Sequence, residues 1–547
     1  MYSVLGICFH LSIRTIEIDY RIWRLLGVYI VLWAALTGVY LNVHNLPLLQ
    51  AIKLSSLAGS CFNAGLTVSI TVYRLFFHRL RRFPGPWGAK LSRFYNVWLA
   101  FESRQYYLEV EDMHRKYGDF VRTEISINRP SAVVLVNGPH SECRKSPFYS
   151  QVSDDVAKIS VPSSRNPDDH RRRRRAWDRG FSIKALGRYE PRIKSRVDVF
   201  LRQMKAQQSC PVNITDWATY LTYDVMGKVG FDKDFHQLES VSEHDTLKDL
   251  HGQMAIVNLL SPVPWLLSML ASFPSLTGSY GAFFDYLPKQ VEEKKKVWQS
   301  NKKEVPDDIF SWILKAIDEN DQSAPPGEFA LREDARLIII AGSDTTGTTL
   351  AHAMFFLASN PSVYRRLQKH MDNIFPEGDA SWSYEKVKNF PYLDVIINET
   401  LRLKPVVPSG MSRVTPPQGL QIDEVWIPGD TIVVIPQWVI HRDERYFVRA
   451  LEFLPERWLA EKGRLIKDER AFFPFQIGPY ACAGKQLALI TLRSTLSRIA
   501  LNFDISFAPD EDGVAFDKGA KDAFTFQLQP LRLVFKERNK AGTVAAS

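Results

Sequence analysis

An uncharged apolar run at residues 25–43 is the strongest constraint on how this chain can fold. As a helix it is long enough to cross a bilayer, where every backbone polar group must be satisfied inside the segment. A second uncharged run at residues 54–73 is weaker, because it carries serines, threonines and Asn63. We therefore predict one or two transmembrane helices and prefer two. In the one-span alternative, the second run lies on the membrane or packs on the rest of the chain.

Basic residues flank the two runs on their outer sides. Lys53 is the only lysine or arginine between them, and the flanking arginines are Arg14, Arg21, Arg24, Arg74, Arg79, Arg81 and Arg82. Because segments rich in lysine and arginine stay in the cytoplasm, both flanks are expected there, joined by a short hairpin on the other side. Without a cleavage site, residues 1–82 should remain as a membrane anchor. Residues 83–87, Phe-Pro-Gly-Pro-Trp, form a stiff hinge before a cytosolic domain at 88–547.

The composition narrows the classes of partner. A length of 547 residues favours several domains. The net charge of +9 suits nucleic acid, an anionic membrane surface or an acidic protein. Nucleic acid ranks last, because basic patches interleaved with aromatic residues are missing. The five cysteines are far apart and form no CxxC pair, which argues against disulfides or a zinc site and favours a reducing compartment.

Hydrophobic periodicity predicts a mostly helical domain with a few short strands. Helices are predicted at residues 108–117, 183–300, 331–359, 391–403 and 485–502. Strands are predicted at residues 120–124, 132–136 and 425–436, with a terminal hairpin of 524–528 and 531–535. The apolar, proline-broken segment at 259–270 either belongs to the core or touches the membrane, and we prefer the membrane. Five arginines at 171–175 wrap around a helix, either as a solvated face or as a site for an anionic partner.

The predicted helix at 331–359 carries an unusual polar cluster, Ala-Gly-Ser-Asp-Thr-Thr, at residues 341–346. Gly342 and the neighbouring hydroxyls predict a local opening of the helix. Burying Asp344 costs several kcal/mol unless it is paired or protonated. Asp344 is therefore either half of a structural salt bridge or part of a proton relay that faces a buried site.

Cys482 lies in a glycine-rich loop just before the helix that starts at Lys485. The positive end of that helix favours a thiolate, which can ligate a metal or attack an electrophile. Gly478 and Gly484 allow the backbone to approach a bulky, flat group, and Phe475 could shield the sulfur. A lone cysteine between glycines is more often an inert packing group. Its role therefore depends on the motifs elsewhere in the chain.

Four motifs follow one another in order: Ala-Gly-x-Asp-Thr-Thr at 341–346, Glu-x-x-Arg at 399–402, Pro-Glu-Arg-Trp at 455–458 and Phe-x-x-Gly-x-x-x-Cys-x-Gly at 475–484. Together they resemble the cytochrome P-450 family, the haem-thiolate monooxygenases. The resemblance covers roughly residues 80–540. With the anchor, the chain resembles a microsomal, fungal-type member. It implies one large catalytic domain, mainly α with small β-sheets, in place of the several domains that the length favours.

The resemblance also implies roles for the motif residues. Cys482 would be the axial ligand of the iron of haem b, in a loop shaped by Phe475, Gly478 and Gly484. Asp344 and Thr345 would be the acid–alcohol pair that delivers protons to dioxygen, with Ala341 and Gly342 leaving room for it. The residues implied as a buried structural triad are Glu399, Arg402 and Arg457, although Glu399 and Arg402 alone would pass for a surface pair.

The chain departs from the family pattern at one position that normally binds a haem propionate. Two residues before the cysteine the family usually has arginine or histidine, and this chain has Tyr480. A tyrosine hydroxyl can hydrogen-bond a propionate but cannot neutralise it. We therefore expect His170, Arg174 and Arg413, which occupy positions where the family contacts the propionates, to carry more of that charge.

The implied activity is monooxygenation at the endoplasmic reticulum membrane. Electrons would come from NADPH through NADPH–cytochrome P-450 reductase, whose acidic face would meet the arginines at 171–175, Lys485 and Arg493. One atom of O2 would enter a lipophilic small molecule, preferably a secondary metabolite such as a terpenoid, alkaloid or polyketide. The alternatives are a fatty acid, an aromatic acid or a xenobiotic. A peroxide-rearranging isomerase or dehydratase, or a non-enzymatic haem sensor, would not need the Asp344–Thr345 pair.

Overall fold

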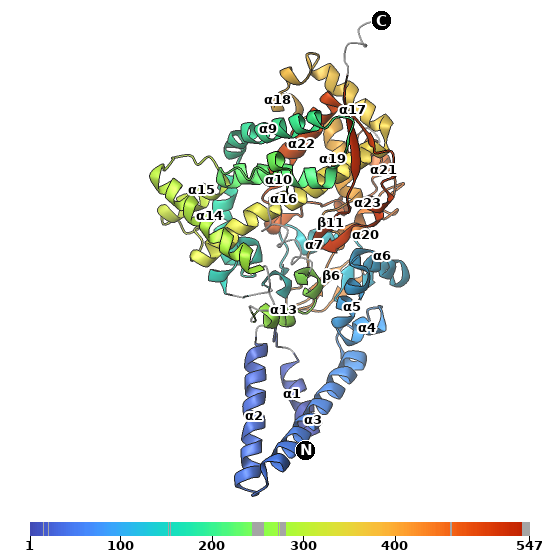
Figure 1. The fold of residues 1–547 in the computed structure, drawn as a ribbon. Coiled ribbons are helices and arrows are strands. Elements are labelled where there is room, and N and C mark those ends of the chain that lie inside the picture. Colours follow the sequence, from blue (N-terminus) through green and yellow to red (C-terminus); the bar gives the residue numbers. More distant parts are fainter. Residues whose placement is uncertain are drawn as a thin grey trace.

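The computed structural model describes residues 1–14, 16–19, 21–150, 153, 155–242, 256–271, 273, 280–459 and 462–538. Three N-terminal helices, α1 (Tyr2–Ile13), α2 (Ile22–Asn42) and α3 (Leu48–Val72), stand below a larger body of helices and small sheets (Figure 1). The predicted fold class, a mainly helical domain that follows apolar N-terminal segments, is confirmed.

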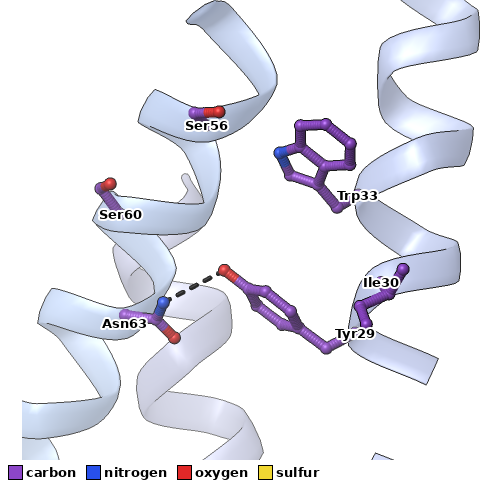
Figure 2. Close-up of a pocket in the computed structure, with 6 residues that line it drawn as sticks. All are labelled: Tyr29, Ile30, Trp33, Ser56, Ser60 and Asn63. Carbon is purple, nitrogen blue, oxygen red and sulfur yellow. Dashed lines mark hydrogen bonds between the residues drawn. The ribbon is translucent and has the colours of Figure 1, made fainter. Parts of the chain in front are cut away.

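The three N-terminal helices pack closely on one another. Within the described ranges, α2 is the single helix that is both long and apolar enough to cross a membrane. Gly6 allows α1 to cross α3, because a Cβ there would lie 2.1 Å from the carbonyl oxygen of Phe62. Ser56, Ser60 and Asn63 of α3 face α2, and Asn63 donates a hydrogen bond of 3.1 Å to the Tyr29 hydroxyl. Figure 2 shows this side of α3 across an open pocket of about 250 Å³.

The hinge predicted at residues 83–87 lies against the domain. Phe83 is 3% exposed, and the Arg122 amide donates a hydrogen bond of 2.7 Å to the Pro84 carbonyl. A Cβ at Gly85 would lie 2.7 Å from the Arg122 carbonyl oxygen, so only glycine allows this approach. The α3–domain connection, which runs through the short π-helix η1 (Tyr73–Phe77), is thus held by specific contacts.

The helices of the large body have the following bounds: α4 (Trp87–Leu91), α5 (Phe94–Ser103), α6 (Tyr106–Tyr117), α7 (Pro130–Asn137), α8 (Pro167–Gly180), α9 (Ile183–Ala206), α10 (Ile214–Phe231), α11 (Gln237–Ser240), α13 (Pro264–Ala271), α14 (Tyr280–Ser300), α15 (Ile309–Asp318), α16 (Glu328–Ser359), α17 (Pro361–Ile374), α18 (Tyr384–Val387), α19 (Pro391–Leu403), α20 (Gln437–His441), α21 (Lys462–Leu465), α22 (Lys485–Asn502) and α23 (Val514–Lys518). The helices predicted at 391–403 and 485–502 coincide with α19 and α22.

The central helix α16 organises the helical core. It packs against α10, α14, α19 and α22, and Figure 1 shows it crossing the middle of the body next to α10. The predicted local opening at its polar cluster is wrong, because α16 is continuous over 32 residues. The Ser343 hydroxyl donates to the Ile339 carbonyl at 2.7 Å, so it bonds within the helical ladder and leaves the ladder intact. Gly342 serves close packing, since a Cβ there would lie 2.5 Å from the Met226 sulfur of α10.

The small sheets lie beside the helical core. Their orders are β1 (Phe120–Val121) with β2 (Ser126–Ile127); β3 (Arg144–Lys145), β5 (Arg413–Val414) and β8 (Ile432–Val433); β4 (Pro211–Asn213), β12 (Arg532–Glu537) and β9 (Phe503–Phe507); β6 (Leu420–Ile422) with β7 (Val425–Ile427); and β10 (Lys521–Ala523) with β11 (Thr525–Gln527). Every pair is antiparallel. The sheet of β3, β5 and β8 matters most for the site below.

Two strand predictions are wrong. The apolar run at 132–136 belongs to the helix α7, which Pro130 starts at its first turn. Five apolar residues alone do not distinguish a buried strand from a buried helix. The predicted terminal hairpin does not form either, because β11 pairs with β10 across the left-handed Phe524, and β12 pairs with β9 and β4.

The apolar segment predicted at 259–270 ends in α13, which lies next to the upper end of α2 (Figure 1). The Trp23 ring of α2 lies 5.7 Å from the ring of Phe273, and the Trp265 ring lies 6.0 Å from that of Phe94 in α5. The segment therefore packs beside the anchor, and its contact with a membrane stays a prediction.

Candidate active site

The Cys482 loop is closed by backbone hydrogen bonds and by one required glycine. The Cys482 amide donates to the Phe475 carbonyl at 2.9 Å. Gly478 has a φ of 72°, and a Cβ there would lie 2.2 Å from the Asn137 carbonyl oxygen, so only glycine fits. Gly484 differs, because it has a φ of −81° and a Cβ there would make only ordinary contacts. Gly478 therefore sets the shape of the loop, and Gly484 caps the start of α22.

Cys482 is exposed to solvent, although the protein around it partly desolvates its thiol. Its side chain is accessible to solvent, and yet burial raises the pKa of its thiol. Both hold for a residue that solvent reaches although protein atoms surround its thiol on most sides. The amides of Gly484 and Lys485 and the charge of Arg174 act on this pKa in the opposite direction. The predicted preference for a thiolate is thus outweighed by burial in the protein alone, whereas a coordinated metal ion would deprotonate the thiol.

The acid–alcohol pair of α16 has defined partners. The Tyr223 hydroxyl of α10 donates to Asp344 Oδ1 at 2.7 Å, and the Thr345 hydroxyl donates to the Ala341 carbonyl at 2.7 Å. Ala341 is the only exposed residue between Ala330 and Ala358, all of which are described. The side of α16 that carries Ala341 therefore borders open space, while the rest of this stretch is packed.

A cluster of basic side chains surrounds Tyr480. The His170 and Tyr480 rings lie 4.9 Å apart, and the Arg413 guanidinium lies 5.1 Å from the Tyr480 ring centroid. The Lys145 ammonium, which the sequence did not single out, lies 4.7 Å above the same ring. Burial, Lys145 and the nearby arginines lower the pKa of His170 to about 3. The predicted residues His170 and Arg413 thus meet at Tyr480 together with Lys145, and of these three His170 is neutral while Arg413 and Lys145 supply the positive charge.

Arg174 holds the cysteine loop from α8. Its Nη1 donates to the Ala481 carbonyl at 2.9 Å, and its Nε contacts Asp178 at 2.7 Å. Arg174 therefore positions the residue directly before Cys482, in addition to adding positive charge.

The donors in this region fit the haem that the motifs imply. Arg413 and Lys145 are 1% and 2% exposed, and within the described part of the chain neither forms an ion pair with a carboxylate. Arg413 Nε is buried without a hydrogen-bond partner. Buried cations that lack anions are costly unless an anion reaches them. Haem would supply the missing anions: Arg413 and Lys145 would bind its propionates, and Cys482 would ligate its iron.

The predicted structural triad forms a closed buried network. Glu399 is bound by Arg402 Nη2 at 2.8 Å and by Arg457 Nε at 2.9 Å, and all three residues are 0% exposed. Trp458 Nε1 and the Leu454 amide also donate to the Glu399 carboxylate. The interpretation of Glu399 and Arg402 as a surface pair is therefore wrong, because Arg457 and the backbone of residues 441–454 enclose them.

The arginine run at 171–175 is divided between core and surface. Arg173 is 1% exposed and bonds Asp334 at 3.0 Å, whereas Arg171 and Arg175 are exposed. Arg493, expected to face a partner, instead pairs with Asp394 at 2.6 Å. Only part of the predicted basic surface is therefore accessible.

Comparison with known proteins agrees with this site. The family model "Cytochrome P-450" matches residues 84–535. The cytochrome P-450 monooxygenase FCK2 of Fusarium pseudograminearum is 37% identical and covers 98% of this chain and 97% of its own. Tryprostatin B 6-hydroxylase of Aspergillus fumigatus is 34% identical, with 98% and 96% covered. The crystal structure of the cytochrome P-450DA haem domain, 19% identical, covers 84% of this chain and 97% of its own with a TM-score of 0.68 and supports the fold alone. The chain therefore belongs to the cytochrome P-450 family and is a monooxygenase of that family.

Proposed function

We propose that this monooxygenase binds haem b through the Cys482 thiolate and oxidises a lipophilic small molecule of secondary metabolism. One observation carries the proposal: a single loop presents a desolvated thiol at Cys482 and, two residues earlier, lies against unpaired buried cations at Tyr480. Haem with a thiolate ligand supplies the activation of dioxygen. The other residues of the site orient the group, hold it and deliver protons.

Proton delivery falls to α16 in this proposal. Asp344 is held by the Tyr223 hydroxyl, and Thr345 lies next to it on the helix, within one turn of the exposed Ala341. An acid and a hydroxyl in sequence can pass a proton from solvent toward bound dioxygen. This pair also argues against the isomerase or dehydratase alternative, which needs no external oxygen. Turnover that continues without NADPH and O2 would favour that alternative.

The proposed substrate class is inferred from the names of the fungal relatives. The names of the fungal relatives include a hydroxylase of a small molecule, tryprostatin B, and several further monooxygenases. We infer a lipophilic secondary metabolite, with hydroxylation as the default outcome. The test compares the metabolites of cells with and without the protein. A metabolite that accumulates in its absence and is consumed by the purified protein with NADPH and reductase supports the inference, and consumption of fatty acids or xenobiotics alone contradicts it.

Electrons would arrive from the acidic face of NADPH–cytochrome P-450 reductase. The exposed cations that remain for this contact are Arg171, Arg175 and Lys485, on α8 and at the start of α22. Arg175→Glu should slow the first electron transfer, and added salt should narrow the difference from the wild type. Arg115→Glu, on the exposed face of α6, is the matched control. Equal rates for both variants would contradict this docking site.

We further propose that α2 and α3 both cross the endoplasmic reticulum membrane. The polar groups of α3 that weaken it as a span find partners inside the anchor: Asn63 bonds Tyr29, and Ser69 bonds a His10 ring nitrogen at 2.8 Å. Polar side chains satisfied by neighbouring helices are tolerated in a bilayer. Figure 2 shows Tyr29 reaching across to Asn63, which supports a hairpin whose polar side is turned inward.

A further inference from the structure

Two like charges face each other in a sheet. Strands β3 and β5 are antiparallel, and their register sets Lys145 opposite Arg413. Cations directly opposite each other destabilise a sheet, more so when buried. Both side chains are almost completely buried. Such a pair is stable only when something negative lies between or beside the two charges.

No carboxylate forms an ion pair with Lys145 or Arg413 in the ranges that the structure describes, and the charge of Asp169, which pairs with Arg172 and Arg173, raises the pKa of Lys145 by less than burial and the nearby arginines lower it. Lys145 Nζ donates to the Pro162 carbonyl at 2.6 Å and lies over the rings of Tyr480 and Tyr149, at 4.7 and 5.2 Å. Arg413 bonds the Tyr149 hydroxyl and the Ser412 carbonyl, and its Nε has no partner. Carbonyl and ring contacts orient a cation but do not neutralise it.

The tyrosine at position 480 explains why a lysine is useful at position 145. A tyrosine there removes one positive charge from the surface that meets the haem propionates. Its ring, however, is flat and apolar, and it supports the ammonium of Lys145 from below. Tyr480 and Lys145 together thus present a positive charge near the place from which an arginine at 480 would present it.

We propose that Lys145 is a haem-binding residue of this protein: together with Arg413 it binds a haem propionate and replaces the cation absent from position 480. The proposal rests on the proposed haem site at Cys482. Burial and the charges of Arg413 and Arg174 hold the pKa of Lys145 well below its usual range in the protein alone. A propionate between the two cations would offset their repulsion. Haem binding would therefore stabilise the charged form of Lys145, and the charged lysine would in turn stabilise bound haem.

The test replaces Lys145 with methionine, which keeps the length of the side chain and removes its charge. The control is Arg144→Met, because Arg144 is the neighbouring cation on β3 but is exposed and pairs with Asp430 at 3.2 Å. The measurements are the rate of haem transfer from the full-length holoprotein to apomyoglobin and the thermal midpoint of the haem-free protein. The first reports on haem binding and the second on the fold.

Lys145→Met should lose haem about tenfold faster or more, as expected for one lost charge-assisted hydrogen bond. Arg144→Met and Lys145→Arg should stay near the wild-type rate. The haem-free Lys145→Met protein should be as stable as the wild type or more stable, because an uncompensated buried charge is gone. Adding Tyr480→Arg to Lys145→Met should slow haem loss again.

An unchanged rate of haem transfer overturns the proposal. So does a parallel fall in the stability of the haem-free protein, which would make Lys145 a purely structural residue. The Lys145→Met holoprotein should keep the spectrum of thiolate-ligated haem. A wild-type protein that lacks this spectrum would instead refute the Cys482 ligand, whatever the Lys145 variant does.

Discussion

Glu399→Gln should be one of the most damaging single-atom changes in this protein. The carboxylate is the shared counter-ion of Arg402 and Arg457, and it also accepts from Trp458 and the Leu454 amide. Glutamine keeps the size but removes the charge, and its NH₂ group would face donors. Both guanidiniums are fully buried, and burial already lowers the pKa of Arg457. Breaking a buried ion pair from one side costs about 3–5 kcal/mol.

That cost is a large share of the 5–15 kcal/mol by which a typical protein is stable. The assay is urea unfolding of the full chain in detergent, followed by tryptophan fluorescence. Glu385→Gln is the matched control, because Glu385 forms an exposed ion pair with Lys388 that is worth under about 1 kcal/mol. The reasoning is refuted if the two variants differ in unfolding free energy by less than about 1 kcal/mol.

Three further predictions concern catalysis, pH and topology. Asp344→Asn should lower kcat by about 10²–10⁴ with little change in substrate affinity; a kcat that stays at the wild-type value contradicts the proton relay. Burial beside Arg402 lowers the pKa of His441 to about 3, so its neutral form contributes stability that is complete above the unfolded pKa of about 6.5 and is lost as the pH falls. Between pH 6.5 and 4.5 the wild type should lose about 2.3 kcal/mol more unfolding free energy than His441→Gln, and parallel pH profiles would show otherwise. In sealed microsomes, a His44→Cys thiol should react with an impermeant maleimide only after detergent is added, whereas a single span would leave it reactive from the start.

The helices were the most predictable part of the fold. Pro391 and Pro405 delimit α19, and Gly484 directly precedes α22, so local chemistry defines their ends. The conformation of residues 132–136 was predicted wrongly, because a short apolar run fits either a strand or a helix. The pairing of β12 with β4 and β9 was missed for another reason: it joins segments far apart in the chain, and no local signal specifies the partner.

The candidate site was predictable where a motif spans a few residues and unpredictable where it depends on distant contacts. Cys482 and Asp344 stand in such motifs. Lys145 has no motif, and only the pairing of β3 with β5 sets it opposite Arg413. Tyr223 likewise reaches Asp344 only because α10 packs along α16. The sequence did offer one clue, since the tyrosine at 480 implied that another cation had to serve the propionates.

The central claim is that the Cys482 thiolate ligates the haem iron, and the reduced, carbon-monoxide-bound absorption spectrum tests it most directly. The wild type and Cys210→Ser, which changes an exposed cysteine outside the site, should both show the red-shifted Soret band of thiolate-ligated haem. Cys482→Ser should lose that band. A thiolate band that persists in Cys482→Ser, or that is absent from the haem-loaded wild type, would contradict the account.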